Sequence, residues 1–281
     1  MTALDTDGPN AAQVAYWNES AGPTWVAMQD ALDHELNDLG LAAMAALAPR
    51  PGERLADIGC GCGATTLELA RRAGERGGVL GVDISAPMLS VARTRAAAAR
   101  LDQASFLQAD AQTCAFEPVD GVFSRFGVMF FADPVAAFAN IRKGVKPGGR
   151  VAFVCWRQLA ENPWMTVPMA AVLPLLPAPP AAPTPGAPGP FAFADRERLF
   201  GILRDAGFTD VAIEPLDAQV SWGDLEISAR MALRLGPVAA LVRENPDLAD
   251  RMADAVRAAL APHIGATGVR LDSATWIVLA R

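Results

Sequence analysis

A short apolar run, three closely spaced glycines and a helical repeat follow one another within residues 55–70. The apolar run ends at Asp57, and the glycines are Gly59, Gly61 and Gly63. Glycine permits tight backbone turns and, because it has no Cβ, lets a bulky ligand lie against the main chain. The first N–H groups of the helix that follows are free to face an electron-rich partner. The segment therefore predicts a strand, a glycine turn and a helix that bind a nucleotide-like cofactor.

The glycine spacing has a second interpretation. Gly59, Gly61 and Ala64 also fit the looser dinucleotide-binding pattern, so the glycines alone do not decide the ligand. Asp57 favours another cofactor, because a dinucleotide-binding strand usually carries an apolar side chain there, whereas a carboxylate suits a ligand with an ammonium group. Residues 57–63 closely resemble the first motif of class I S-adenosylmethionine-dependent methyltransferases.

Four later segments agree with this resemblance in their order along the chain. One apolar run ends at Asp83, whose carboxylate can accept two hydrogen bonds from a ribose diol. Another is followed by Asp110, which the resemblance places near the adenine amino group. The remaining two resemble the fourth strand with its turn and the glycine turn into the fifth strand. The segments span residues 79–84, 106–111, 121–127 and 146–154.

The resemblance implies S-adenosyl-L-methionine as cofactor and S-adenosyl-L-homocysteine as its product. It also implies that an N-terminal helix folds aromatic side chains over the methionine end, where a cation–π contact to the sulfonium is attractive. The cofactor-binding residues implied in this way are Asp57, Gly59, Cys60, Gly61, Gly63, Asp83, Ile84, Met88, Asp110, Ala111, Ser124, Tyr16 and Trp25.

Several of these residues also have a purely structural interpretation. Asp83 could cap the helix that follows Ser85, and Asp110 could form an Asx turn. Met88 could pack in the core instead of against adenine. Cys60 is expected to fill space in the turn, as is Cys62, because small residues between turn glycines more often do so than bind metal.

No general base is identified by the sequence. Methyl transfer from a sulfonium mainly requires alignment and exclusion of water, because the leaving group is already good. The candidates are His34 as a proton acceptor, Arg125 as a group that orients the acceptor or pairs with an acid, and Tyr16. The residues that could line an apolar acceptor pocket, or simply pack in the core, are Trp156, Asn162, Trp164 and Met165.

Composition limits the other classes of function. With a net charge of −7 and no long run of like charges, the chain is not expected to bind nucleic acid. The two histidines and four cysteines lack the spacing of a metal site, so no metal is expected. No uninterrupted apolar stretch of about 18 residues predicts a membrane span. The cysteine usage, and a start unlike a signal peptide, indicate a cytoplasmic enzyme. The expected partner is a small-molecule acceptor, and a homodimer is left open.

Strands alternate with helices from residue 53 onwards, which predicts an α/β fold with a parallel sheet covered on both faces. With the resemblance, the prediction is a Rossmann-like, doubly wound, mostly parallel seven-stranded sheet with an antiparallel last strand. Eight prolines between Pro174 and Pro190 predict a stiff extended linker. The expected parts are N-terminal helices over the cofactor site (1–50), the Rossmann-like domain (51–222 and 266–281) with a proline-rich insert (157–193), and a helical cap (223–265).

The expected function is methyl transfer to carbon, oxygen or nitrogen of a small, largely apolar acceptor. The pattern is similar to the ubiquinone/menaquinone-type methyltransferases, from which the chain departs in its proline-rich segment and helical insert. Two alternatives stay open: another S-adenosylmethionine-related transferase on the same fold, and a non-catalytic nucleotide-cofactor-binding module, including an NAD-type one.

Overall fold

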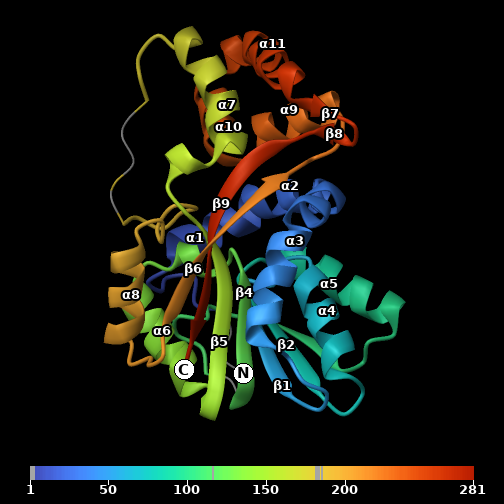
Figure 1. The fold of residues 1–281 in the computed structure, drawn as a ribbon, viewed down its shortest axis with the longest axis vertical. Coiled ribbons are helices and arrows are strands. Elements are labelled where there is room, and N and C mark those ends of the chain that lie inside the picture. Colours follow the sequence, from blue (N-terminus) through green and yellow to red (C-terminus); the bar gives the residue numbers. More distant parts are fainter. Residues whose placement is uncertain (1–3, 116, 181–183, 185) are drawn as a thin grey trace.

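A seven-stranded sheet with strand order β3-β2-β1-β4-β5-β9-β6 organises the molecule (Figure 1). The computed structural model describes residues 4–115, 117–180, 184 and 186–281. Strands β1 to β5 pair in parallel, and β9 lies antiparallel between β5 and β6. The predicted fold class is therefore confirmed. The strands are β1 (Arg54–Ile58), β2 (Gly78–Asp83), β3 (Ala104–Gln108), β4 (Val119–Arg125), β5 (Val145–Trp156), β6 (Ala212–Val220) and β9 (Leu271–Ala280).

Helices cover both faces of this sheet (Figure 1). Helices α3, α4 and α5 pack on β1 to β5 from one side, and α6 packs on β5 beside α8 on the other. Helices α1 and α2 lie near the carboxyl ends of the parallel strands; α1 packs on α2, and α2 contacts α5 and α3. Their bounds are α1 (Ala11–Glu19), α2 (Ala21–Ala27), α3 (Gln29–Leu47), α4 (Ala64–Ala73), α5 (Ala86–Ala99), α6 (Pro134–Lys143) and α8 (Arg196–Asp205).

The cap contains more of the chain than the sequence predicts. Helices α9, α10 and α11 come from the expected insert, but α7, from the segment assigned to the proline-rich insert, packs against α10 and α11. Pro163 occupies the first turn of α7, where its missing N–H costs nothing, and Trp164 and Met165 are buried. The cap helices are α7 (Pro163–Val172), α9 (Leu225–Arg234), α10 (Gly236–Glu244) and α11 (Ala249–Leu260), followed by the hairpin β7 (Ile264–Gly265) and β8 (Gly268–Val269).

Some element boundaries differ from the predictions. The third strand, expected over 106–111, ends at Gln108, so Asp110 lies in the loop beyond it. The fifth strand begins at Val145 and includes the expected glycine turn, with an irregularity in its pairing to β4. The predicted linker from Pro174 begins within a 3₁₀ turn, Leu173–Leu175, and its residues 181–183 and 185 lie outside the described residues.

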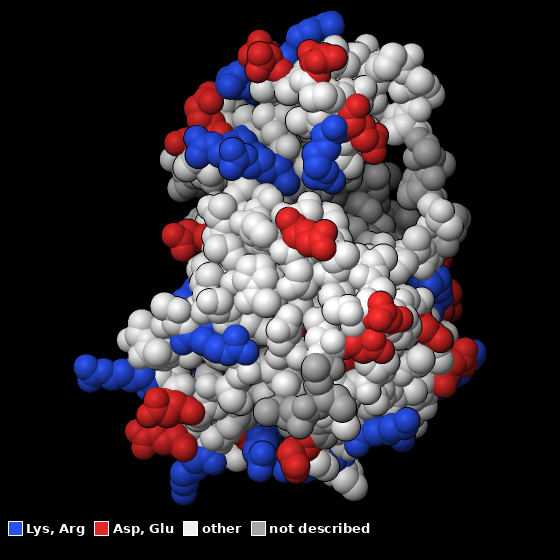
Figure 2. Space-filling view, turned by 180° about the vertical axis from the view of Figure 1, so that it is seen from behind, with Lys and Arg blue, Asp and Glu red and all other residues white. Residues whose placement is uncertain are grey.

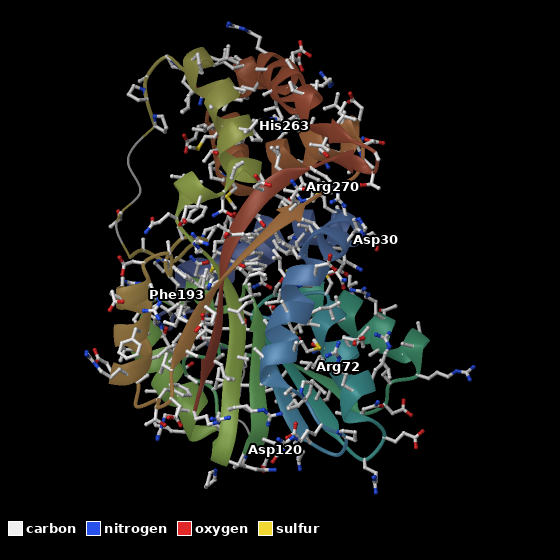
Figure 3. The ribbon with its side chains drawn as sticks, viewed as in Figure 1. Asp30, Arg72, Asp120, Phe193, His263 and Arg270 are labelled. Carbon is white, nitrogen blue, oxygen red and sulfur yellow. The ribbon has the colours of Figure 1, made fainter. Side chains whose placement is uncertain are left out.

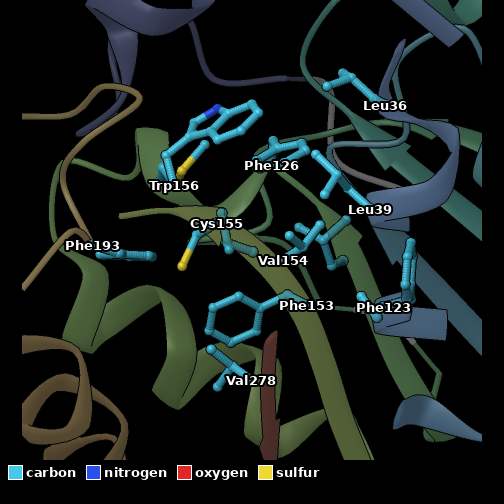
Figure 4. Packing of buried hydrophobic residues seen from close by; sticks show 14 of the residues in the cluster. Leu36, Leu39, Phe123, Phe126, Phe153, Val154, Cys155, Trp156, Phe193 and Val278 are labelled. Atoms are coloured by element: carbon cyan, nitrogen blue, oxygen red, sulfur yellow. The ribbon is translucent and has the colours of Figure 1, made fainter. Parts of the chain in front are cut away.

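The core of the sheet is aromatic on one face and mostly aliphatic on the other. Phe153 packs against Phe138 of α6, with ring centroids 5.4 Å apart, and near Phe193. Val154 points to the opposite face, as alternation along a strand requires, beside Leu39 of α3 (Figure 4). β5 is therefore buried on both sides, as expected of a strand within a doubly covered sheet.

The surface carries charges of both signs. Figure 2 shows Lys, Arg, Asp and Glu scattered over the rear face, with uncharged surface between them. Among the described residues, every helix is too short or too polar to cross a membrane.

A close backbone contact should make Gly59 hard to replace. A Cβ there would lie 2.6 Å from Gly127 Cα, whereas a Cβ at exposed Gly148 would meet nothing within 4 Å. Both glycines have positive φ, so alanine at either position should lower the free energy of unfolding by about 1–2 kcal/mol. We expect Gly148→Ala to lose that amount in chemical unfolding, and Gly59→Ala to lose clearly more. Equal losses would show that the contact with Gly127 is not tight.

Candidate active site

The carboxyl ends of β1, β2 and β4 bring the predicted motif residues to one edge of the sheet. Asp57, at the end of β1, lies in register with Gly81 of β2 and Phe123 of β4. The glycine turn leaves β1 across the end of β2, where the Gly59 N–H donates to the Val82 carbonyl oxygen at 2.8 Å. The sheet register therefore places the turn against its two neighbouring strands.

Asp57 is fully buried beneath this turn. Its Oδ2 accepts hydrogen bonds from the hydroxyls of Thr65 (2.8 Å) and Thr66 (2.6 Å) in the first turn of α4. Its Oδ1 is buried without a hydrogen-bond partner among the described residues. Burial raises the pKa of Asp57 to about 6, against the opposing effect of the two threonine bonds. A carboxylate oxygen in this position can accept a hydrogen bond from a ligand.

Asp83 holds the glycine turn from the end of β2. Its Oδ2 accepts the Gly61 N–H at 2.8 Å, and its Oδ1 accepts the Ser85 N–H at 2.8 Å. The bond to the Ser85 N–H fits the purely structural role, in which Asp83 caps the helix after Ser85. The bond to the Gly61 N–H joins the same carboxylate to the glycine turn. Burial raises the pKa of Asp83, and the N–H groups of Ser85 and Gly61 oppose this. Each carboxylate oxygen retains a second lone pair for a ligand.

Gly61 is covered by a flexible side chain only. A Cβ at Gly61, which has φ +54°, would lie 2.7 Å from Met88 Cε and within 4 Å of no other heavy atom. A Cβ at Gly63 would instead meet Ala92 and Phe106, so Gly63 serves the packing of α5 against the turn. A ligand can therefore reach the main chain at Gly61 by displacing the end of Met88.

The loop after β3 is held by the N-terminal segment. Asp110 Oδ1 accepts the Gln112 N–H at 2.8 Å, which is the Asx turn of the structural interpretation, and Oδ2 accepts from Asn10 Nδ2 at 2.9 Å. Ala111, next to it, is buried, and its carbonyl accepts from Asn140. Both oxygens of the Asp110 carboxylate therefore have partners within the chain, and its contact with adenine stays a prediction.

Three other predicted cofactor residues support the turn. Ser124 Oγ donates to the Ile58 carbonyl oxygen at 2.7 Å and accepts the Gly127 N–H, which links β4 to β1. The Ile84 carbonyl accepts from Asn18 Nδ2 of α1 at 3.0 Å. Burial raises the pKa of the Cys60 thiol well above its usual value, so Cys60 is held as a neutral, space-filling group.

Cys62 fills space in the same way. Its thiol is buried, and burial raises its pKa to about 12. Among the described residues, no group of three or more His, Cys, Asp and Glu side chains could hold a metal ion.

The N-terminal aromatic residues form one cluster around Trp17. Its ring lies 5.8 Å from Trp25, 5.3 Å from Phe130 and 5.6 Å from Tyr16. The Trp17 carbonyl accepts from Ser85 Oγ at 2.8 Å, so α1 is anchored beside the end of β2. Tyr16 is 43% exposed and lies on the outer side of the cluster. Trp17 is thus the central aromatic residue of this cluster.

Arg125, at the end of β4, is held by α3. Its guanidinium lies 2.9 Å from Asp33, whose other oxygen lies 3.0 Å from Arg95 of α5. Arg95 also donates to the Cys62 carbonyl oxygen at 2.9 Å. Asp33, Arg95 and Arg125 line part of a cavity of about 210 Å³ between α3, α4 and α5. Arg125 is therefore paired with an acid, which was one of its two predicted roles. Through Asp33 and Arg95, this ion-pair network reaches the glycine turn.

Neither histidine lies buried at this edge. His34 is exposed on α3, and Figure 3 shows His263 and Arg270 in the cap, at the opposite end of the molecule from Asp120. The neighbour of His34, Glu35, is buried, with its Oε1 unpartnered among the described residues. The signal for Glu35 was present in the sequence: an acid placed at helical spacing between Leu32 and Leu39.

A row of aromatic side chains leads from the sheet edge into the cap. Phe126 stacks on Trp156, with centroids 4.2 Å apart and an interplanar angle of 13°. Trp164 lies 4.8 Å from Trp156, and Trp222 lies 5.4 Å from Trp164. The Nε1 of Trp222 is buried without an acceptor among the described atoms. We call these four residues the aromatic row.

Asn162 and Met165 complete the expected acceptor residues. Asn162 Oδ1 accepts from Trp164 Nε1 at 3.0 Å and from the Ala274 N–H at 2.9 Å, so it fixes the cap to β9. Met165 is buried in α7. Asn162 therefore has a structural role in this structure.

Comparison with known proteins gives matches within the same part of the chain. Residues 55–149 match the family described as "Methyltransferase domain". The chain is similar to "Aklanonic acid methyltransferase DauC" of Streptomyces sp. (strain C5), with 38% identity over 107 residues, 37% of this chain and 49% of that protein. It is also similar to a "Demethylmenaquinone methyltransferase" of Bacillus cereus (strain ATCC 10987 / NRS 248), with 36% identity over 104 residues, 36% of this chain and 44% of that protein. The matched segment thus spans about half the length of these relatives.

A solved structure shares the fold over most of this chain. It is a Haemonchus contortus phosphoethanolamine N-methyltransferase 2 in complex with S-adenosyl-L-methionine, with a TM-score of 0.53 and 20% identity. The similarity covers 87% of this chain and 52% of that one. Residues 55–149 are thus similar to a methyltransferase domain, and the solved structure, by its name a methyltransferase in complex with S-adenosyl-L-methionine, shares the fold of the chain.

Proposed function

We propose that this protein transfers a methyl group from S-adenosyl-L-methionine to a small, largely apolar acceptor. The observation that carries the proposal is the pair of carboxylates, Asp57 and Asp83, on adjacent strands at the glycine turn. The relatives named above are methyltransferases of small molecules by their names, which supports the same class of reaction here.

The residues at the sheet edge fit this cofactor. The unpartnered Oδ1 of Asp57 offers an acceptor for an ammonium group, and the free lone pairs of Asp83 offer acceptors for two ribose hydroxyls. Gly61 leaves the main chain open beneath Met88. On the adenine side, Asn10 would have to yield its bond to Asp110 if that carboxylate meets the adenine amino group.

When bound, the cofactor supplies an activated methyl group, so the protein has to align the acceptor and exclude water. The aromatic row is a buried apolar cluster that begins at Phe126, the residue after Arg125, and continues into the cap. Asp33 holds the Arg125 guanidinium in place through the 2.9 Å ion pair. We propose that Arg125 thereby positions a carbonyl or anionic group of the acceptor.

The four cysteines, at positions 60, 62, 114 and 155, are all free thiols in the structure. This agrees with a reducing compartment, and we propose that the enzyme works in the cytoplasm.

Ligand-dependent melting tests the proposal against an NAD-type module. S-adenosylhomocysteine at a hundredfold excess over its Kd should stabilise the fold by about 2.7 kcal/mol, seen as a rise of several degrees in Tm, whereas NAD(P) should leave Tm unchanged. Incubation with S-adenosylmethionine and the acceptors of the two relatives, aklanonic acid and demethylmenaquinone, then tests methyl transfer through release of S-adenosylhomocysteine. A rise in Tm with NAD(P) alone would contradict the proposal.

The ribose assignment of Asp83 can be tested separately. Asp83→Ala removes acceptors for the ligand and for the Gly61 N–H, so we expect calorimetric affinity for S-adenosylhomocysteine to fall by about 1–3 kcal/mol. Asp133→Ala is the control: it removes the helix cap that accepts the Ala136 N–H, on the loop before α6. That variant should lose about 1 kcal/mol of stability and keep its affinity. Unchanged affinity in Asp83→Ala would remove the assignment.

The buried Asp57 should make stability depend on pH. Its pKa is raised from 3.8 to about 6 in the fold, so the folded state favours the protonated form. The stability it contributes is complete below pH 3.8 and is lost as pH rises through about 6. Two pKa units correspond to about 3 kcal/mol, so between pH 4 and 7 the wild type should lose about that much relative to Asp57→Asn. Parallel stability–pH curves in urea unfolding would show that Asp57 does not titrate in this way.

A further inference from the structure

Glu35 lies on the interior face of α3. The buried face of this helix includes Leu32, Leu36 and Leu39, and Glu35 is only 6% exposed among them. Its Oε1 has no hydrogen-bond donor among the described residues. A buried carboxyl oxygen without a partner is costly to keep, so its retention calls for a functional explanation.

Helix and strand geometry place Glu35 at the carboxyl edge of the sheet. Arg150 of β5 donates from Nε to the Leu47 carbonyl oxygen, which fixes the C-terminal end of α3 at the level of Arg150. From Leu47 back to Glu35 the helix rises about 18 Å. From Arg150 to Trp156 the strand rises about 20 Å. Because α3 packs on β5 and runs antiparallel to it, Glu35 lies at the level of Trp156.

The surroundings at this level are apolar and aromatic. Figure 4 shows Trp156 stacked on Phe126, with Leu36 and Leu39 of α3 beside Phe126. In β9, Thr275 pairs with Trp156 in register. The charged group that acts on Glu35 is Arg125 of β4, whose guanidinium is already paired with Asp33. Burial raises the pKa of Glu35 well above its usual value, and Arg125 only partly opposes this.

We propose that Glu35 is the group that binds the hydroxyl of a planar aromatic acceptor lying along the aromatic row and that accepts its proton. The proposal rests on the proposed methyl-transfer function and names its acceptor class. A flat ring is the shape that stacks on Trp156 and Trp164, and a hydroxyl supplies the donor that Oε1 lacks. The unpartnered Nε1 of Trp222 offers a donor to a carbonyl on the same acceptor.

The proton transfer balances with methyl transfer. The Glu35 carboxylate takes the hydroxyl proton, and the electron pair released on oxygen forms the new bond to the methyl carbon. The bond between that carbon and sulfur breaks, and its electron pair remains on sulfur. The products are a methyl ether, S-adenosylhomocysteine and protonated Glu35, which then returns its proton to water. Because only the carboxylate can act, the rate should rise with pH through the raised pKa of Glu35.

A matched ligand pair tests the hydroxyl contact without any turnover. 2-Naphthol and 2-methoxynaphthalene differ only in the hydroxyl proton and its methyl replacement. We expect the wild type, titrated by tryptophan fluorescence with and without S-adenosylhomocysteine, to bind 2-naphthol at least about tenfold more tightly than its methyl ether. Glu35→Gln should lose most of this preference. Glu197→Gln, an exposed change on α8, should keep it.

The outcomes separate this inference from the proposed function. The role of Glu35 is overturned if Glu35→Gln keeps the preference for 2-naphthol over its methyl ether, or if the wild type does not bind 2-naphthol. In either case, a rise in Tm with S-adenosylhomocysteine leaves the proposed function standing. Absence of that rise in the wild type counts against the proposed function, and the naphthol titration without added nucleotide is still decisive for the Glu35 contact. Glu35→Met carries the same comparison if Glu35→Gln does not fold.

The folded state gives an independent readout. The raised pKa of Glu35 means that its contribution to stability is complete at low pH and is lost as pH rises through that pKa. Compared with Glu35→Gln, the wild type should therefore become progressively less stable as pH rises above the range in which a glutamate ordinarily titrates. Curves that stay parallel would show that the carboxyl is not buried as described, and would overturn the proposal.

Discussion

The backbone contact between Gly59 and Gly127 is the constraint on which the active-site edge depends. Neither residue has a side chain, so the turn after β1 and the turn after β4 approach until a Cβ on either would lie within 2.7 Å of the other's Cα. Ser124 joins the same two strands through the Ile58 carbonyl and the Gly127 N–H. With the turn held in this way, the Gly61 N–H donates to the Asp83 carboxylate, and Asp57 is fully buried beside the first turn of α4. Local sterics at two glycines therefore set the geometry of both carboxylates.

Helix α3 connects two chemically different halves of this edge. On one side, Asp33 pairs with Arg125 and Arg95, and Arg95 reaches the Cys62 carbonyl of the glycine turn. On the other side, Glu35 faces the apolar interior at the level of the aromatic row. Because neighbouring helix positions diverge by about 100°, residues close in sequence serve the charged and the apolar half. The proposed cofactor and acceptor would thus be held by one helix.

The sequence predicts the sheet and its edge because those features follow from local patterns. An apolar run that ends in Asp57 or Asp83 has to place the acid at the carboxyl edge of a parallel sheet. Contacts distant in sequence could not be predicted: Asn10 reaches Asp110, and α7 joins helices about 70 residues later in the chain. Glu35 was missed for another reason. A histidine has an ordinary pKa near neutral, which made His34 the candidate proton acceptor, yet His34 is exposed and the adjacent Glu35 is buried.

A crystal structure of the protein grown with saturating S-adenosylhomocysteine tests the central claim most directly. We expect adenosine over Gly61, with Met88 displaced, the ribose hydroxyls on the Asp83 carboxylate, and the amino group of the ligand within hydrogen-bond distance of Asp57 Oδ1. Density for the ligand elsewhere, or a glycine turn that stays covered by Met88 at saturation, would contradict it.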